Sequence, residues 1–218
     1  MNIIKKIIIL LIISFIFSNK IIIPMDESQT DHIKAYGIAF WSLENNNPVD
    51  WLLNYKGGSF IVNNNQNIEN ECIIRGISYY KIGAPDINNI YQTIEENNME
   101  IVLLEKSPKI AVYSPPGKQP WDDAVTLALT YAEIPYDIIF DKEILLGELR
   151  KYDWLHLHHE DFTGQYGKFY KNYHNKSWYI EMQNSFEQSA QEYNFNSVSD
   201  MKKNIAQRIK DYIVNGGF

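Results

Sequence analysis

The sequence contains a single cysteine, Cys72, among its 218 residues. One cysteine cannot form an internal disulfide, and it excludes a Cys-x-x-Cys redox or zinc pair. The thiol lies in a predicted helix next to Ile73 and Ile74, a context that favours a buried thiol over a nucleophile. The fold therefore depends on packing and not on covalent cross-links.

Several catalytic signatures are also absent. The chain has no Gly-x-Ser-x-Gly elbow and no His-Glu-x-x-His helix. A phosphate-binding loop is excluded between Ser114 and Lys118, because the glycine spacing is wrong and Gln119 replaces the required hydroxyl. Asp122 and Asp123 follow in the first turn of a predicted helix, where carboxylates suit the helix dipole but repel phosphate. We expect these two residues to cap the helix, and they could also contact a neutral or cationic ligand.

Positive charge is scarce: 20 Lys and Arg face 27 Asp and Glu, so the formal net charge is −7. Nucleic acid binding requires clustered basic residues that displace the counterions of phosphates. The one compact basic run after residue 18 is Lys202 and Lys203, which we expect on a solvated helix face. We predict no nucleic acid partner.

No hydrophobic run is long enough to span a bilayer. The longest, Ile7 to Phe17, would extend about 16 Å as a helix, roughly half of a hydrocarbon core. Lys5 and Lys6 precede it and Ser18 follows, which is the pattern of a secretory signal peptide. We predict a signal peptide at residues 1–18, a periplasmic or extracellular protein, and no stable membrane insertion after cleavage; a membrane anchor is the alternative.

Residues 19–107 predict a small α+β region. Strands are expected at 21–24, 49–55, 59–62 and 78–82, and helices near 33–43, 68–75 and 85–97. Lys56-Gly57-Gly58 predicts a β-hairpin turn, because glycine tolerates positive φ. Ser28 or Asp31 is expected to cap the first helix.

Residues 108–218 alternate strand and helix, which predicts a parallel or mostly parallel sheet flanked by helices. Strands are expected at 109–113, 136–140 and 154–158, and helices at 121–133, 142–151, 178–193 and 199–215. Gly216, Gly217 and Phe218 have the pattern with which such a chain enters its next strand. We therefore expect a C-terminally truncated fragment that lacks a central strand.

The segment WLHLHHEDFTGQYGKFY, at 154–170, carries the strongest functional signal. It brings histidines and carboxylates to the end of a buried strand, where α/β sheets bind ligands. Acid–base catalysis is expected from His158, His159 and Glu160, because neighbouring carboxylates orient an imidazole. The expected ligand-binding residues are His156, Asp161 and Tyr166, with Lys118, Asp122 and Asp123 from the preceding loop.

Two other features of this segment leave alternatives open. A divalent metal could bind His156, His158 and Glu160, although strand-end histidines more often bond a carbonyl or pack as aromatics, so no cofactor is predicted. Aromatic side chains suit the apolar faces of sugar rings, but they could equally form a small core beneath a loop. These aromatic residues are Phe162, Tyr166, Phe169, Tyr170, Tyr173, Trp178 and Tyr179.

Most of the chain after the signal segment resembles an exported bacterial family, known chiefly from Bacteroidetes-type genomes, whose members often carry the label asparagine synthetase B. The likeness lies in IIIPMDESQTDHIKAYGIAFW, VDWLLNYKGGSFIV and KIAVYSPPGKQPWDDAVTLALTYAEIPYDIIFD, and it is most specific at HLHHEDFTGQYGKF. The resemblance implies a domain similar to class I glutamine amidotransferases, with a flavodoxin-like sheet. It also implies a nucleophile elbow after the glycines, beyond Phe218.

The sequence departs from genuine glutamine-dependent asparagine synthetases. Asn2 follows Met1 where those enzymes expose a processed cysteine, and no Ser-Gly-Gly-x-Asp-Ser loop is present. We therefore predict an exported α/β protein that binds a small polar ligand, a sugar or an amide, and that could be an amide or glycan hydrolase. The alternatives are a non-catalytic binding or scaffold protein of the cell envelope, and asparagine synthesis as the family label implies.

Overall fold

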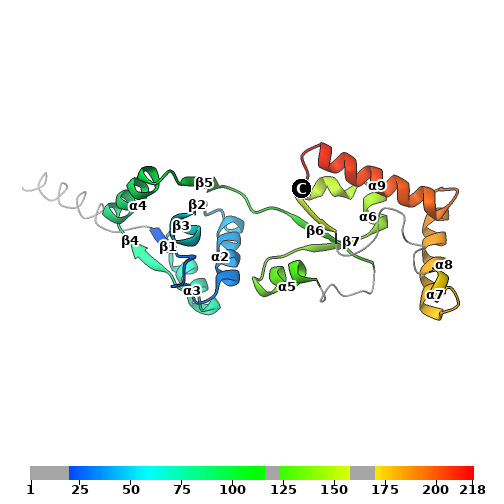
Figure 1. The fold of residues 1–218 in the computed structure, drawn as a ribbon, viewed down its shortest axis with the longest axis horizontal. Helices are drawn as coiled ribbons and strands as arrows, with labels where there is room; N and C mark the ends of the chain where they lie inside the picture. The colour runs from blue at the N-terminus through cyan, green and yellow to red at the C-terminus, as the bar shows by residue number, and fades with distance from the viewer. Residues whose placement is uncertain (1–19, 116–122, 158–169) are drawn as a thin grey trace, which may run out of the picture. The chain divides into compact units, whose positions relative to one another are not determined.

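The computed structural model describes residues 20–115, 123–157 and 170–218, which form an α/β protein with one antiparallel and one parallel sheet. The contacts between residues divide the chain into two compact units. The first unit contains the chain up to Ser107 together with Ala128–Ile134, and the second contains Pro108–Leu127 and Pro135–Phe218. Figure 1 shows the elements of both units along the chain.

The first unit is built on a five-stranded sheet with the order β4-β1-β3-β2-β5. Every pairing in it is antiparallel. The strands are β1 (Lys20–Ile23), β2 (Val49–Leu53), β3 (Ser59–Asn63), β4 (Tyr80–Ile82) and β5 (Glu100–Leu104). The predicted hairpin is confirmed, since β2 pairs with β3 and Gly57 and Gly58 have φ of 78° and 93° between them.

Helices cover both faces of this sheet. The helices α2 (His32–Glu44) and α3 (Gln66–Arg75) share one apolar cluster with Ile21 and Ile23, whereas α4 (Ala84–Glu96) shares another with Ile22. Both faces are buried, and in keeping with this the apolar residues of β1 and β3 follow one another without alternation, as Ile21–Ile23 and Phe60–Val62. Asp31 caps α2 by accepting a hydrogen bond from Lys34 N at 3.0 Å, so the second of the two predicted caps is correct.

The edge strand β5 was not expected from the sequence. After Glu100 its residues are aliphatic but largely exposed, with 40% of Ile101 and 56% of Leu103 accessible to solvent. An aliphatic strand exposed on both faces shows no alternation of polar and apolar residues, so periodicity does not reveal it. The strand β5 is recognised only by its pairing with β2, in which Trp51 lies opposite Val102.

The second unit is built on a parallel sheet with the order β7-β6-β8. Its strands are β6 (Ile110–Tyr113), β7 (Asp137–Ile139) and β8 (Trp154–Leu157), and both pairings are parallel, which confirms the prediction. The helical elements are α5 (Ala124–Tyr131), α6 (Asp141–Leu145), the 3₁₀ turn η2 (Glu148–Lys151), α7 (Tyr170–Tyr173), α8 (Ser177–Glu192) and α9 (Val198–Val214).

Alternate residues of β6 and β8 point to opposite faces of this sheet. Ala111, Tyr113 and Leu155 pack with α6 and α9 in one apolar cluster. The other face carries Val112 and His156, and the start of α5 lies over it, because His156 bonds Asp123 just before that helix. Figure 1 shows α5 on one side of the strands and α6 and α9 on the other.

Two details of the second unit differ from or extend the predictions. The helix expected at 142–151 is interrupted at Gly147, whose φ of 77° ends α6 before η2 begins. At the other edge of β8, Phe218 N donates to Asp153 O at 3.2 Å and Leu155 N donates to Phe218 O at 2.6 Å. This is the bonding pattern of parallel strands, so Phe218 extends the sheet beside Trp154.

Within the part of the chain that the structure describes, no helix combines the length and the apolar character needed to cross a bilayer.

Candidate functional site

Strands β6 and β8 bring two polar side chains to the carboxyl edge of the parallel sheet. His156 pairs with Val112 in register, and Ser114 follows Val112 by two residues. Side chains two apart in a strand share a face, so Ser114 and His156 lie on the same face. The strand after β6 in the sequence, β7, lies on one side of it, and β8 lies on the other. The order of strands reverses at this point, and open α/β sheets bind ligands in the crevice beside such a reversal.

His156 and Asp123 form a close pair at this edge. His156 Nε2 lies 2.5 Å from Asp123 Oδ2, and the two side chains are only 18% and 10% exposed. Asp123 also receives weaker contacts of 3.4 Å from the main-chain N–H groups of Val125 and Thr126. The predicted capping role of Asp123 is therefore combined with a contact to the strand.

Charge around Asp123 keeps its carboxyl group ionised. Burial by itself would raise the pKa of Asp123, but the hydrogen bond and charge of His156, with the N–H groups of Thr126 and Val125, hold the pKa below its usual value. A carboxylate bonded to Nε2 fixes the orientation of the imidazole. The other ring nitrogen, Nδ1 of His156, has no hydrogen-bond partner among the residues described.

Ser114 adds a buried hydroxyl group to the same face. The residue is fully buried, and within the described segments its Oγ has no hydrogen-bond partner. Its main-chain N–H donates to Ile139 O at 3.0 Å, so the backbone is still in the sheet at this residue. A buried hydroxyl without a partner costs roughly 1–3 kcal/mol of stability. Such a cost is typical of a polar group that binds a ligand or a water molecule.

The spacing of the strands separates Ser114 from His156. Neighbouring strands lie about 4.8 Å apart and two residues advance about 6.6 Å, which places the two Cα atoms roughly 8 Å apart. A direct bond between Ser114 Oγ and the imidazole is therefore not expected, and none is present.

Most of the other predicted site residues fall outside the described segments. Only His156 and Asp123 of the predicted set are described, and the structure brings these two together. The residues outside are His158, His159, Glu160, Asp161, Tyr166, Lys118 and Asp122. Their predicted roles remain predictions.

Most of the possible metal ligands also lie outside the described segments. Of His156, His158 and Glu160, only the first is described. Among residues 20–115, 123–157 and 170–218, no group of three or more His, Cys, Asp or Glu side chains is placed to hold a metal ion.

Part of the predicted aromatic cluster is described on α7 and α8. Tyr179 is buried, and its ring lies 6.3 Å from Tyr170 and 5.6 Å from Trp178. Tyr173 and Trp178 have ring centroids 5.3 Å apart and are 38% and 49% exposed. The described aromatics therefore combine a packed ring with exposed ones, and both predicted uses remain open.

The solvated position predicted for Lys202 is wrong. Lys202 is 2% exposed, and its Nζ lies 2.6 Å from Asp141 Oδ2. Tyr113 OH donates to Asp141 Oδ1 at 2.6 Å, and the rings of Phe140 and Phe186 lie 4.7 and 4.4 Å from the ammonium group. The spacing of Lys202 to Ile205 and Ile209, three and seven residues, is a signal that it shares their buried face. Lys203 alone is exposed, as predicted.

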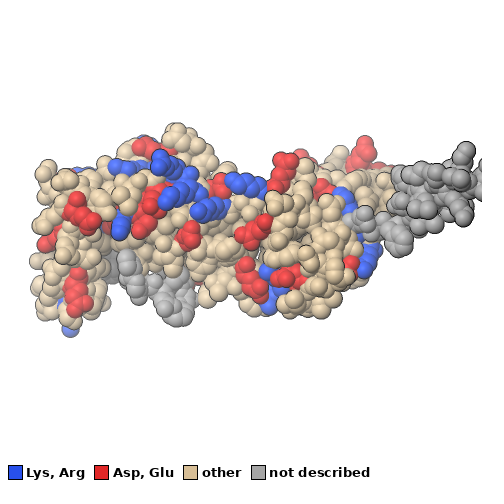
Figure 2. All heavy atoms as spheres, turned by 180° about the vertical axis from the view of Figure 1, so that it is seen from behind, with Lys and Arg blue, Asp and Glu red and all other residues tan. Residues whose placement is uncertain are grey.

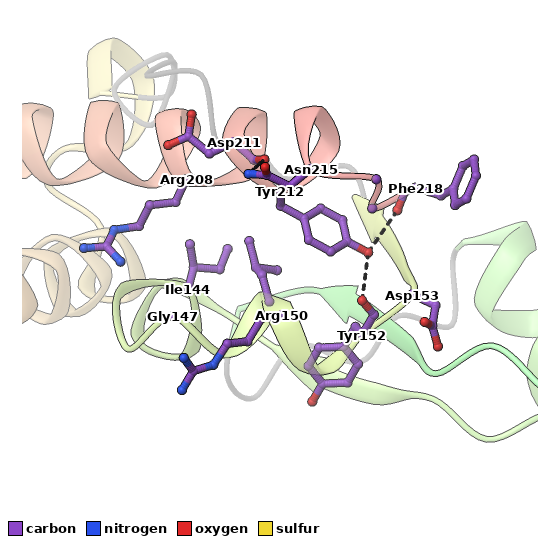
Figure 3. Close-up of a pocket in the computed structure, with 13 residues that line it drawn as sticks. Ile144, Gly147, Arg150, Tyr152, Asp153, Arg208, Asp211, Tyr212, Asn215 and Phe218 are labelled. Carbon is purple, nitrogen blue, oxygen red and sulfur yellow. Dashed lines mark hydrogen bonds between the residues drawn. The ribbon is translucent and has the colours of Figure 1, made fainter.

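A cavity of about 560 Å³ lies at the opposite, amino edge of the parallel sheet (Figure 3). It is open to solvent and is lined by α6, η2, the last turns of α9 and the chain from Gly216 to Phe218. Gly217 is required there, because a Cβ atom at this position would overlap the ring of Tyr212. Sequence reasoning did not find this cavity, since its walls come from segments separated by about sixty residues in the chain.

No protein-family model, no curated protein and no solved structure matches this chain.

Proposed function

We propose that the second unit binds a small polar ligand, an amide or a sugar, at the carboxyl edge of its parallel sheet. One observation carries this proposal: the fully buried Ser114 hydroxyl has no partner among the described residues, on the same face as the Asp123–His156 pair. The hydroxyl can donate a hydrogen bond to a ligand oxygen, and Nδ1 of His156 can accept one from a ligand N–H or O–H. Both amides and sugars offer this combination.

The strand order supports the same location. The order β7-β6-β8 corresponds to the order 2-1-3 with which a flavodoxin-like sheet begins. In that arrangement the ligand crevice lies between the first and third strands, which here are β6 and β8. A flavodoxin-like or amidotransferase-like sheet is therefore part of the proposal, in keeping with the family resemblance of the sequence.

A Ser114→Ala variant tests the proposal, because a ligand role and a packing role predict opposite results. If the Ser114 hydroxyl binds a ligand, its removal should weaken ligand binding. The ligand-free protein should then be at least as stable as before. Binding of L-glutamine, L-asparagine and N-acetylglucosamine would be measured by calorimetry, with thermal unfolding in parallel. Ser59→Ala is the matched control: Ser59 is equally buried, but its Oγ donates to Lys56 O at 3.1 Å in the first unit.

The results distinguish binding from packing. We expect Ser114→Ala to weaken binding by about tenfold, the loss of one hydrogen bond to a ligand, whereas Ser59→Ala lowers stability and leaves binding unchanged. If no probe binds, or if Ser114→Ala binds like the unsubstituted protein, the ligand site is refuted. A non-catalytic scaffold protein then becomes the better explanation.

Hydrolysis is the reaction class that we propose for this site if the ligand is turned over. An imidazole oriented by a carboxylate is a suitable general base, and His156 is held in this way by Asp123. Release of ammonia from L-glutamine or L-asparagine would establish amide hydrolysis, and a His156→Gln variant should abolish it. His32→Gln is the control, because His32 is exposed and, within the described part of the chain, its ring bonds only the main-chain oxygen of Asp26.

We also propose that the protein is exported, on the basis of Lys5, Lys6 and the apolar run Ile7 to Phe17. A reporter enzyme fused behind residues 1–30 should be exported, and Leu11→Arg in the apolar run should retain it in the cell. Retention of the unsubstituted fusion would refute export.

A further inference from the structure

We propose that the cavity between η2 and α9 binds a small organic anion, whose acidic group is held by Arg150 and Arg208. The cavity belongs to the second unit and lies before the start of β8. The Asp123–His156 pair lies near the carboxyl end of the same strands. The anion site is therefore separate from the site of the proposed function, and either can exist without the other.

The size and walls of the cavity suit a small molecule. A volume of about 560 Å³ falls within the range of about 300–1,000 Å³ that is usual for ligand pockets. Apolar surface comes from Ile144 and Leu149, and Tyr152 and Tyr212 also line the cavity. Gly216 has a φ of 95° and Gly217 leaves space for the Tyr212 ring, so the local backbone is suited to these walls.

Two guanidinium groups at one end of the cavity carry uncompensated positive charge. Arg208 Nε donates to Asn204 Oδ1 at 2.6 Å, a neutral partner, and neither Arg150 nor Arg208 forms an ion pair with a described residue. In Figure 3 Arg208 extends from α9 past Ile144 and Arg150 extends from η2, and both residues line the cavity at the end away from Phe218. A guanidinium group matches the geometry of carboxylate and phosphate groups.

The acidic residues of the cavity oppose this charge only weakly. Asp211 accepts a hydrogen bond from Gln207 Nε2 at 2.7 Å, and Figure 3 shows its carboxylate on the other side of α9 from the Arg208 guanidinium. Asp153 lies toward the tyrosine end, where its Oδ2 accepts a hydrogen bond from Lys109 N at 2.8 Å. The end of the cavity near the arginines is therefore the positive one.

The tyrosines add no negative charge near neutral pH. Burial, together with the charge of Asp137 and the hydrogen bond that Asp137 accepts from the hydroxyl, raises the pKa of Tyr152 to about 12. Burial likewise raises the pKa of Tyr212, whose hydroxyl donates to Tyr152 O at 3.3 Å. The neutral rings can pack against the apolar body of a ligand while the arginines hold its charged group.

The surroundings favour an anion even though the whole chain is acidic. Exposed basic residues lie on α6, η2 and α9, and Figure 2 shows Lys and Arg atoms gathered over the second unit. These residues are Lys142, Arg150, Lys203, Arg208 and Lys210, with Lys151, which is paired with Glu148 at 3.0 Å. A local cluster of one sign raises the concentration of oppositely charged ligands at its surface.

Phenyl phosphate, benzoate and phenol are the probes that test this site. The first two carry a phosphate or a carboxylate on an aromatic ring, and phenol is the neutral control. Binding to the protein would be measured by calorimetry and by NMR shifts at low salt. We expect saturable binding of at least one anion, with a dissociation constant in the millimolar range or below, and none of phenol.

The variants Arg150→Gln and Arg208→Gln keep polar, exposed side chains and should leave the melting temperature unchanged. Each should weaken binding of the anion by about tenfold, which is the usual effect of losing one charge-assisted hydrogen bond. Lys210→Gln is the matched control, since Lys210 is an exposed cation on α9 that does not line the cavity. It should bind like the unsubstituted protein.

The proposal is overturned if the arginine variants bind phenyl phosphate and benzoate as the unsubstituted protein does, or if Lys210→Gln weakens binding equally. Equal binding of phenol would show that the cavity recognises only the ring. Ser114→Ala should leave anion binding intact, so failure of this site and failure of the proposed amide or sugar site are distinguishable.

Discussion

The buried ion pair between Lys202 and Asp141 allows the sharpest test of the packing in the second unit. The two side chains are only 3% and 4% exposed, and their charged atoms lie 2.6 Å apart. Tyr113 OH donates to the other carboxylate oxygen, and the rings of Phe140 and Phe186 flank the ammonium group. We consider a Lys202→Met variant, which keeps an unbranched side chain, one atom shorter, and removes its charge.

The expected loss follows from what remains in the core. Without Lys202, the Asp141 carboxylate stays buried with a single side-chain donor among the described residues, the Tyr113 hydroxyl. Removal of one partner of a buried ion pair costs about 3–5 kcal/mol. Two factors favour the lower end: Asp141 is the first residue of α6, where the helix dipole stabilises a carboxylate, and methionine packs well against aromatic rings. We expect a loss of about 3 kcal/mol, a large share of a typical domain stability of about 5–15 kcal/mol.

A double-mutant cycle separates the pair from the packing. Asp141→Asn should also destabilise the protein, but the double variant Asp141→Asn, Lys202→Met should lose less than the sum of the single variants, by about 2 kcal/mol. Urea unfolding at neutral pH, followed by circular dichroism, measures each free energy. Lys203→Met is the control, because Lys203 is exposed beside Lys202 and should change stability by less than about 0.5 kcal/mol. If Lys202→Met loses less than about 1 kcal/mol, or the coupling is near zero, the buried ion pair is not formed as described.

Three further predictions concern other parts of the chain. The Cys72 thiol, fully buried and with its pKa raised by burial to about 12, should resist a thiol reagent in the folded protein and react at once in denaturant; fast labelling of the native state would contradict its burial. The pKa of Tyr152 is raised from 10.0 to about 12 in the folded state. The protonated hydroxyl therefore stabilises the folded state fully below pH 10, and this contribution is lost as the pH rises toward 12. The free energy of unfolding measured in urea should fall over this pH range, and it should fall less in Tyr152→Phe. A Cβ at Gly37 would overlap the Ala132 carbonyl, so Gly37→Ala should destabilise the first unit by about 1–3 kcal/mol in thermal unfolding, whereas Ser28→Ala, an exposed change, should not.

Much of the fold was predictable because it depends on local patterns. Helices begin and end close to the expected positions, since caps such as Asp31 and stop residues such as Gly76 act within one turn of the helix. The parallel sheet followed from the alternation of strands and helices after Pro108. In contrast, β5 depends on its partner β2, which lies about fifty residues earlier in the chain.

The site was predicted only in part, for a similar reason. The strand ending at Leu157 and the helix starting at Ala124 were both expected to carry polar residues at the carboxyl edge. The contact between His156 and Asp123 depends on which strand pairs with β6, and a local sequence pattern does not predict that pairing. The role of Ser114 was missed because a serine after a strand is common, and only its burial without a partner makes it unusual.

The amino-acid sequence alone determined where helices and strands form and that Cys72 lies in the core, because these properties depend on neighbours within a few residues. It also determined that the strands of the second unit run parallel, because this depends on the length of the connections between them. Tertiary structure alone decided that Lys202 is buried against Asp141 and that the arginines of η2 and α9 share one cavity. In both cases the energy of a charged group depends on solvent exclusion and on partners from distant segments, which only the folded chain brings together.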